Sequence, residues 1–472
     1  MIKLWMLSLA SGIAAVTFAV VALPREIAPA PPPSPGSFAP SVVERGEMLA
    51  TVGNCVGCHT AEGGHRLAGG RRLWTPFGNI ASRNITPELA TGIGSWSEAA
   101  FRRAMREGIA RDGSQLFPAC PFDHFTKLAE ADLVAIYAYL MSGPAVRSPP
   151  SINHTILPLG VRSFQPIWRA IYLSQGFQRA EGAKSEEWNR GAYLVEGLAA
   201  CGSCHTPRNI LGAEQVGHPL AGEKMFPWLA PSLDLSPSPM RWTRADLQTY
   251  LRGGSSPQGR AVGPMAEIAE NLRKLSSSDL DAVTTYLLSF NRPQSGSPDR
   301  DVAHALAHAT RDGDPEHDRG RRIFTRHCAS CHDAAMSSTG RPEDLSLKSA
   351  LWDQEPHNLI SIVLLGVRPA ASRGSMPAFR DVLGEDDLSL WPRTCVAYAP
   401  IARPGHCWPS GRVSYGRPFC SSRRDETAAN RRRHQNGPRK RRSWLKKSSL
   451  PRSACSRPSI ISTSRTMVLA LG

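Results

Sequence analysis

The sequence predicts a mainly α-helical protein in which one small helical domain occurs three times in tandem. Three observations predict this fold. The motif C-x-x-C-H occurs three times, an Arg-Gly pair opens a helical run before each copy, and a Leu-x-x-x-Asp-Leu segment follows each copy. A chain of 472 residues has room for about three domains of roughly 100–150 residues each. A hydrophobic content of 41% is sufficient for packed cores.

The expected organisation alternates domains with connecting segments. An apolar segment at 1–23 and a proline-rich linker at 24–41 precede domains at 42–150, 183–293 and 315–390, with linkers at 151–182 and 294–314 and a basic tail at 391–472. The third domain is expected to have an incomplete closing helix.

The N-terminal segment predicts export from the cytoplasm. An apolar run extends from Leu4 to Leu23 and is just long enough to span a bilayer. No small-x-small cleavage site precedes Pro24, which favours a retained membrane anchor over a cleaved signal peptide. With either alternative, the rest of the chain is expected at the periplasmic face of a bacterial inner membrane. The proline-rich stretch that follows is typical of a semi-rigid spacer.

The three C-x-x-C-H motifs contain six of the eleven cysteines and predict covalent haem attachment. Two thiols one helical turn apart can add to the two vinyl groups of one haem, and the histidine that follows becomes the proximal ligand of the iron. Zinc would need four ligands at each site, and no second motif stands at suitable spacing. We therefore expect three covalently bound haem c groups, held by Cys55, Cys58 and His59, by Cys201, Cys204 and His205, and by Cys328, Cys331 and His332.

The surroundings of each motif repeat as well. An Arg-Gly pair precedes each motif, and its glycine would let another helix cross closely. An apolar helix that ends at a glycine follows each motif, and glycine at that place is a natural helix C-cap. The Arg-Gly pairs begin at Arg45, Arg190 and Arg319; the helix ends are Gly108, Gly254 and Gly366; the closing segments are Leu128–Leu133, Leu275–Leu280 and Leu383–Leu388.

Two methionines stand at matching positions and are predicted to bind iron on the side opposite the histidine. Met265 follows Gly254 by 11 residues, and Met376 follows Gly366 by 10 residues. A thioether ligand raises the reduction potential, and a six-coordinate iron cannot bind oxygen or peroxide. A single methionine is often only a core residue, but the matched position in two repeats favours the ligand role.

The first repeat departs from this pattern. Cys120 stands where methionine is expected, and His124 follows four residues later. A neutral imidazole is a good iron ligand, whereas a thiolate would lower the potential strongly. His124, Cys120 or some other group therefore remains open as the distal ligand of the first haem.

The net charge of +16 belongs to the tail. Residues 391–472 hold 18 of the 56 Lys+Arg residues but only 2 of the 40 Asp+Glu residues, so that the remaining 390 residues hold 38 of each. Because these 390 residues are neutral overall, the high net charge of the chain does not indicate that they bind a nucleic acid.

The tail also breaks the third repeat. The closing segment reaches Leu390 and is followed by Trp391-Pro392, with a proline in the first turns of the expected helix. We expect the tail to be disordered. A shift of the reading frame near codon 389 explains the break inside a domain best, and a basic arm that binds anionic lipid or an acidic partner is the alternative.

Residues 42–389 resemble the multi-haem cytochrome c subunits of membrane-bound periplasmic dehydrogenases of the alcohol, gluconate and aldehyde types. The resemblance rests on long segments that begin at Trp74 (Trp-Thr-Pro-Phe-Gly-Asn-Ile), Asn84 (Asn-Ile-Thr-Pro), Thr91 (Thr-Gly-Ile-Gly-Ser-Trp-Ser), Asn189 (Asn-Arg-Gly-Ala-Tyr-Leu-Val-Glu-Gly) and Cys204 (Cys-His-Thr-Pro-Arg-Asn). It implies three tandem cytochrome c-type helical haem domains. Many relatives carry methionine where Cys120 stands.

The resemblance also implies partners. Members of this family take electrons from a catalytic subunit that carries a molybdopterin, a quinone or a flavin, and pass them to ubiquinone or a terminal oxidase. The segment around His124 resembles the branch that is paired with molybdenum hydroxylases.

Two function classes follow from these features. The favoured one is an electron-transfer subunit without catalytic residues of its own, because the body has no dinucleotide-binding loop and no nucleophile–base pair. The alternative is a peroxidase-like enzyme that uses an open first haem.

Overall fold

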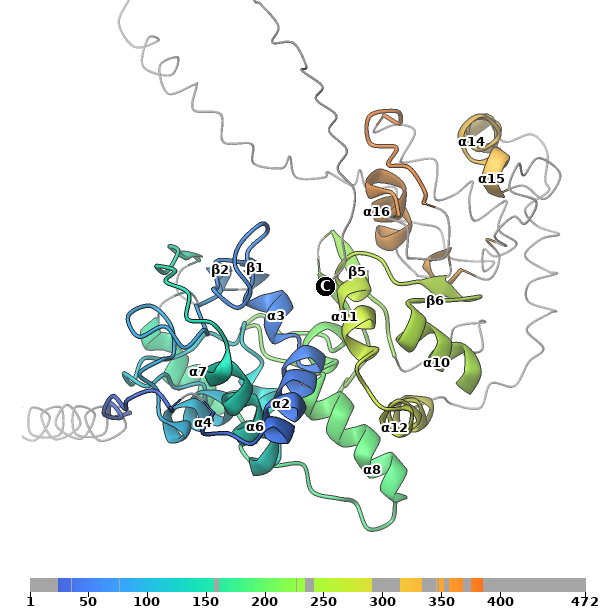
Figure 1. Cartoon of the computed structure of the whole chain (residues 1–472). Coiled ribbons are helices and arrows are strands. Elements are labelled where there is room, and N and C mark those ends of the chain that lie inside the picture. The colour runs from blue at the N-terminus through green and yellow to red at the C-terminus, as the bar shows by residue number, and fades with distance from the viewer. Residues whose placement is uncertain are drawn as a thin grey trace, which may run out of the picture. The chain divides into compact units, whose positions relative to one another are not determined.

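A computed structural model describes residues 24–34, 36–75, 77–156, 160, 162–225, 227–233, 242–290, 315–332, 345, 348–351, 356–367 and 375–384. All of them belong to the first of two units into which the chain divides, Met1–Arg412; the second unit, Val413–Gly472, lies outside the described residues. The described part is mainly helical, as the sequence predicts, with three small antiparallel sheets (Figure 1).

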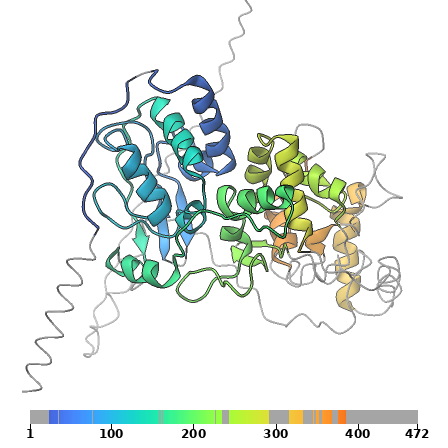
Figure 2. The ribbon, with the colours of Figure 1, turned by 90° about the horizontal axis from the view of Figure 1, so that it is seen from below.

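The elements around the first motif are helices and one hairpin. They are α2 (Pro40–Val52), α3 (Cys55–Cys58), β1 (Arg72–Thr75), β2 (Gly78–Ala81), α4 (Glu98–Glu107), α5 (Phe122–Phe125) and α6 (Glu130–Ser142). Helix α2 crosses α6 at Gly46, where an added Cβ would lie 1.9 Å from the carbonyl oxygen of Ala135. Arg45 next to it donates from Nε to Oδ1 of Asp132, 2.9 Å away. Figure 2 shows the two helices side by side.

The second motif has the same arrangement. Its elements are α8 (Glu186–Tyr193), the π-helical turn η2 (Leu194–Leu198), α9 (Gly202–His205), β4 (Glu223–Met225), β5 (Trp228–Ala230), α10 (Arg244–Gly253), β6 (Ser255–Ser256), β7 (Gly259–Arg260), α11 (Pro264–Leu272) and α12 (Ser277–Leu288). A Cβ on Gly191 would lie 2.1 Å from the carbonyl oxygen of Ala282, so α8 and α12 also cross at a glycine. The expected close helix crossing is confirmed in both repeats.

The segment between these two groups is packed. It contains β3 (His154–Thr155), the 3-10 turn η1 (Arg162–Phe164) and α7 (Gln165–Tyr172), and β3 joins β1 and β2 in the sheet order β1-β2-β3. Trp168 is fully buried against Phe77 and Phe122, and its Nε1 donates to the carbonyl oxygen of Leu211, 2.9 Å away. The stretch expected as a linker therefore contributes to a core.

Fewer elements are described around the third motif. They are α14 (Pro315–His327), α15 (Ala329–His332), η4 (Ser349–Leu351) and α16 (His357–Leu365). A separate core joins these elements around Phe324, Cys328, Leu359 and Leu383. The closing segment is described only as far as Gly384.

Glycines end the helices where the sequence predicts them. The residues Gly108, Gly254 and Gly366 follow α4, α10 and α16 with φ of 66°, 69° and 70°. Because this left-handed backbone strains any residue with a Cβ, a glycine at each position stops the helix at little cost.

The N-terminal apolar segment 1–23 and the tail 391–472 lie outside the described residues. Among the helices that the structure does describe, none combines the length and the apolar character needed to cross a bilayer.

Candidate haem-attachment sites

Each C-x-x-C-H motif forms one short helical turn directly after a longer helix. The backbone N–H of the motif histidine donates to the carbonyl oxygen of the first cysteine in all three, at 2.9 Å for His59, 3.0 Å for His205 and 3.0 Å for His332. This bond closes a turn of α-helix, and it places both cysteines of a motif on one side with the histidine after them. The spacing read from the sequence therefore produces the same backbone geometry three times.

Two of the motif histidines are oriented by backbone carbonyls. Nδ1 of His59 lies 2.6 Å from the carbonyl oxygen of Arg83, and Nδ1 of His205 lies 2.7 Å from that of Pro231. A carbonyl can only accept, so Nδ1 carries the proton and Nε2 keeps its lone pair for a metal. Burial lowers the pKa of both imidazoles, which favours this neutral form.

Five of the six motif cysteines are buried or half-buried thiols, and Cys331 is exposed. Burial raises the pKa of Cys55 and Cys201 to about 12 and that of Cys58 and Cys328 to about 11. A reactive redox dithiol or a zinc-binding pair needs the opposite, a thiol pKa lowered by positive charge. All six motif cysteines are free of disulfides. Protonated cysteines that are free of disulfides are therefore in keeping with attachment of haem through thioether bonds.

An arginine braces each of the first two motifs. Nη1 of Arg71 donates to the carbonyl oxygen of Gly57, 2.6 Å away, and Nη2 of Arg208 donates to that of Ser203, 2.8 Å away. Gly57 and Ser203 occupy the same place, third in C-x-x-C. Sequence reasoning missed both arginines, because they follow their motifs at unequal distances and no repeat pattern marks them.

The two methionines lie with the cores that hold their motifs. Met265 is the second residue of α11 and packs, half-buried, against the core that the first two motifs share, which includes both Cys55 and Cys201. Met376 is half-buried against the core that contains Cys328, and its backbone pairs with Val367 at 2.8 and 3.0 Å. The fold thus brings each predicted iron ligand into the same core as its motif.

Cys120 lies near the first motif. Its side chain packs against the core that includes Cys55, and burial together with the fields of Cys55 and Cys58 raises the pKa of its thiol to about 12. The residue at the expected methionine position therefore faces the first attachment site.

His124 lies instead against the second motif. Its Nδ1 is 2.7 Å from the carbonyl oxygen of Glu196, and its Nε2 is 2.8 Å from Oε1 of Glu214. A Cβ on Gly202, inside the second motif, would lie 2.8 Å from its Cε1. Both ring nitrogens are engaged away from the first motif, which speaks against His124 as the distal ligand of the first haem.

Residues that follow the second motif contact the first attachment site. Asn271 of α11, the helix that carries Met265, donates from Nδ2 to Oδ1 of Asn54, 2.9 Å away, at the entrance of the first motif. Glu267 of the same helix lies 3.2 Å from Nη2 of Arg71. The thiol of Cys58 is also close enough to Cys204 for that group to raise its pKa. Two attachment loops that are distant in sequence are therefore neighbours.

Comparisons with known proteins agree with this geometry. Residues 43–144 match the family described as Cytochrome c, and residues 315–390 match the family described as Cytochrome C oxidase, cbb3-type, subunit III. The fructose dehydrogenase cytochrome subunit of Gluconobacter japonicus is 35% identical over 392 residues, covering 78% of this chain and 80% of the relative. The gluconate 2-dehydrogenase cytochrome c subunit of Pantoea cypripedii is 35% identical over 360 residues, covering 72% and 81%.

The chain belongs to the family of dehydrogenase cytochrome c subunits. Cytochrome c domains carry covalently bound haem c, in keeping with the motif turns described above. A further relative is a nicotinate dehydrogenase subunit of Pseudomonas putida, which is 40% identical over 397 residues. That alignment covers 82% of the cytochrome but only 33% of the relative, so the cytochrome spans about a third of that protein.

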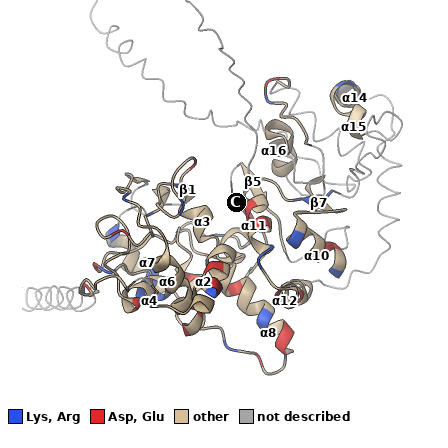
Figure 3. Ribbon diagram, viewed as in Figure 1, with Lys and Arg blue, Asp and Glu red and all other residues tan. Residues whose placement is uncertain are grey.

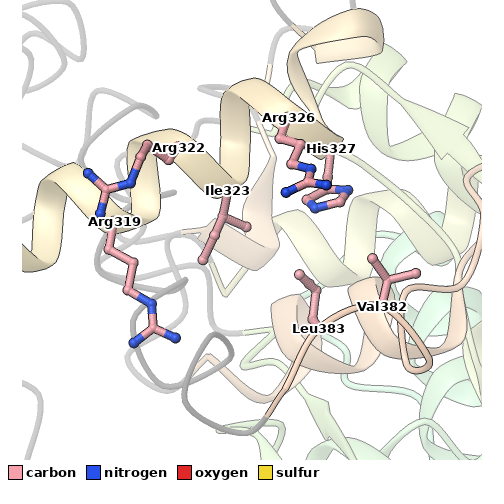
Figure 4. Close-up of a pocket in the computed structure, with 7 residues that line it drawn as sticks. All are labelled: Arg319, Arg322, Ile323, Arg326, His327, Val382 and Leu383. Carbon is pink, nitrogen blue, oxygen red and sulfur yellow. The ribbon is translucent and has the colours of Figure 1, made fainter.

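The cytochrome also has a cavity of about 440 Å³ beside its third motif. It is lined by Arg319, Arg322, Ile323, Arg326, His327, Val382 and Leu383 (Figure 4). Arg319 of α14 corresponds to Arg45 of α2 and Arg190 of α8, which bind the closing helices of their own repeats. The cavity thus lies along the face of α14 that corresponds to the helix-crossing face in the other two repeats.

The described surface mixes both signs of charge. Helix α8 carries both signs, whereas the charged residues of α6 and α11 are acidic and the one of α7 is Arg169 (Figure 3). This agrees with the neutral body of the sequence.

Proposed function

We propose that the chain is a tri-haem c-type cytochrome that carries electrons for a dehydrogenase. The observation that carries the proposal is the helical turn shared by all three C-x-x-C-H motifs, closed each time by the same backbone bond. Haem bound there would exchange one electron at its iron. The chain itself supplies the thiols, a neutral imidazole with a fixed tautomer at the first two motifs, and an apolar core beside each motif.

The proposal includes three domains, one for each motif, and the distal ligands. Met265 and Met376 are the ligands proposed for the second and third haems, supported by their place in the cores of their motifs. For the first haem the proposal is Cys120, because it faces the first motif whereas His124 is engaged at the second.

The donor is proposed to be a catalytic dehydrogenase subunit with a molybdenum, quinone or flavin cofactor. The names of the relatives support this class of partner, since they are cytochrome subunits of fructose and gluconate dehydrogenases. The relation to the nicotinate dehydrogenase of Pseudomonas putida favours the molybdenum branch expected from the sequence. Ubiquinone or a terminal oxidase is the proposed acceptor, at the periplasmic face of the inner membrane.

The closeness of the first two attachment loops supports electron exchange between their haems. Asn54 and Arg71 of the first site contact Asn271 and Glu267 of α11, the helix that carries Met265, and Cys204 lies close enough to Cys58 to raise its pKa. A short, rigid separation favours fast exchange because little of the structure has to rearrange.

The number of haems tests the proposal directly. The protein is matured in a host that exports and ligates haem, boiled in detergent, and assayed as the pyridine haemochrome. We expect three haems per chain, resistant to extraction because thioethers are covalent. Two or fewer would overturn the tri-haem assignment.

Electron flow is tested separately. Substrate added to the isolated cytochrome should leave its haems oxidised, and addition of the partner subunit should reduce them. Steady turnover of an alcohol or aldehyde by the isolated chain would contradict the carrier function.

A further inference from the structure

Three metal-ligating side chains meet where the segment after Cys120 touches the second motif. Asp123 and His124 belong to α5, and Glu214 follows the second motif in sequence. One ligand atom from each of the three residues lies within 4.8 Å of the other two. The closest pair is Nε2 of His124 and Oε1 of Glu214, 2.8 Å apart.

His124 is oriented as a metal-binding histidine usually is. Its side chain is buried, with 3% of its surface exposed, and Nδ1 lies 2.7 Å from the carbonyl oxygen of Glu196. The carbonyl accepts from Nδ1–H, so that Nε2 turns toward the two carboxylates. A second hydrogen bond of this kind fixes the tautomer and the ring plane of most histidines that bind metals.

Asp123 lies beside the His124–Glu214 pair and takes no part in its hydrogen bond. Its side chain is half-buried, and burial raises its pKa, although the nearby charges of His124 and Arg208 act in the opposite direction. Within the described part of the chain, no other residue donates a hydrogen bond to it. Two carboxylates side by side repel each other, and a cation bound between them would relieve that repulsion.

We propose that Asp123, His124 and Glu214 together bind one divalent cation of the zinc class. A mixed set of one imidazole and two carboxylates suits zinc, whereas calcium and magnesium prefer sites made of oxygen alone. Water would complete the coordination. None of the three residues belongs to the haem-attachment motifs, so the site is additional to them.

The cation would act as a clip between the first two repeats. α5 follows Cys120 directly, and Glu214 lies 3.6 Å from Arg208, which braces Ser203 of the second motif. Positive charge added there disfavours the oxidised, more positive iron. Resting on the proposed function, this predicts a higher reduction potential for the second haem, with the third unchanged.

The competing explanation is a plain ion pair. A doubly protonated His124 could donate to both Glu196 and Glu214 with no metal present, and Arg208 and Lys127 would supply the remaining positive charge. The two explanations differ in the effect of zinc and in the role of Asp123.

The test is a calorimetric titration of the full, haem-loaded chain with zinc chloride after removal of metals with EDTA. Haem loading matters because thioether formation removes the motif thiols as zinc ligands. We expect one saturable site per chain, with affinity at least about tenfold weaker in Asp123→Asn and Glu214→Gln. Asp112→Asn is the matched control, since this exposed carboxylate lies 11 residues before Asp123 and outside the cluster.

Three outcomes would overturn the proposal: no saturable zinc binding, equal binding by Asp123→Asn and Asp112→Asn, or calcium binding as tight as zinc. Asp123→Asn keeps the His124–Glu214 bond and so guards against a loss caused by misfolding. Zinc stoichiometry does not depend on haem redox chemistry. Three haems without a zinc site would contradict only the zinc proposal. Zinc binding with fewer than three haems would contradict only the tri-haem assignment.

Discussion

The guanidinium of Arg190 donates two hydrogen bonds to the carboxylate of Asp279, from Nε at 2.7 Å and from Nη2 at 3.0 Å, although 89 residues separate them. Arg45 and Asp132 form the corresponding ion pair in the first repeat, 87 residues apart. Each pair fastens the helix before a motif to the helix that closes the repeat, next to a glycine at which the helices cross. In both repeats the ion pair thus holds the helix before the motif against the closing helix at the point where the two cross.

Gly191→Ala should destabilise the protein, because the added methyl would meet the carbonyl oxygen of Ala282 at 2.1 Å and force α8 away from α12. Overpacking of this kind costs about 1–3 kcal/mol. Urea unfolding measures the loss. Gly217→Ala is the control, since no atom of the described chain lies within 4 Å of its added Cβ, and equal stability of the two variants would contradict the close crossing.

Cys120→Ala should change the spin state and the potential of one haem, because the group that faces the first motif is lost. His124→Gln should leave that haem unchanged, since its ring is engaged at the second motif. Low-temperature electron paramagnetic resonance measures the spin state of the haems in both variants, and carbon monoxide binding to the reduced protein shows whether a distal ligand has been lost. The reverse pattern would make His124 the ligand, and no effect of either variant would place the ligand elsewhere.

Tyr193→Phe should weaken the contact between the first two repeats. Its hydroxyl donates to Oδ2 of Asp132, 2.5 Å away, and accepts from the backbone N–H of Ala129 at 3.1 Å. Loss of these bonds should cost about 1 kcal/mol in urea unfolding, with the haem spectra unchanged. Tyr172→Phe serves as the control, because its hydroxyl forms no hydrogen bond within the described residues.

The same tyrosine predicts a pH dependence. Burial and the hydrogen bond to Asp132 raise the pKa of Tyr193 above its ordinary value of 10.0. Because the folded pKa is raised, its stabilising effect is complete below pH of about 10 and is lost as the pH rises further. Thermal unfolding between pH 9 and 11 should therefore show a steeper fall for the natural protein than for Tyr193→Phe. Parallel curves would contradict the assignment.

The break after residue 390 predicts an error in the reading frame. The family match to the third repeat ends at that residue, and the cavity along α14 lies on the face that corresponds to the crossing face of α2 and α8. Resequencing of codons 385–395 should reveal one missing or extra base whose correction restores an apolar helix. Clean in-frame DNA, with the tail detected by mass spectrometry, would support a genuine basic arm.

Local pattern alone determined much of the fold. The C-x-x-C-H spacing predicts a helical turn, and all three turns form because the closing bond runs between residues four apart. Gly46 and Gly191 mark helix crossings, and Gly108 and Gly254 end helices, because only glycine tolerates those contacts or dihedral angles. These features depend on neighbours in sequence or on a repeat that can be aligned with itself.

The tertiary structure decided which side chains meet across the contact between the first two repeats. His124 stands four residues after Cys120, yet its ring lies against Gly202 of the second motif, while Cys120 faces the first. Arg71 and Arg208 brace equivalent carbonyls from unequal places in the sequence. The reason is physical: spacing along the chain constrains the turn that contains a residue, but only packing between segments determines which distant group its side chain can reach.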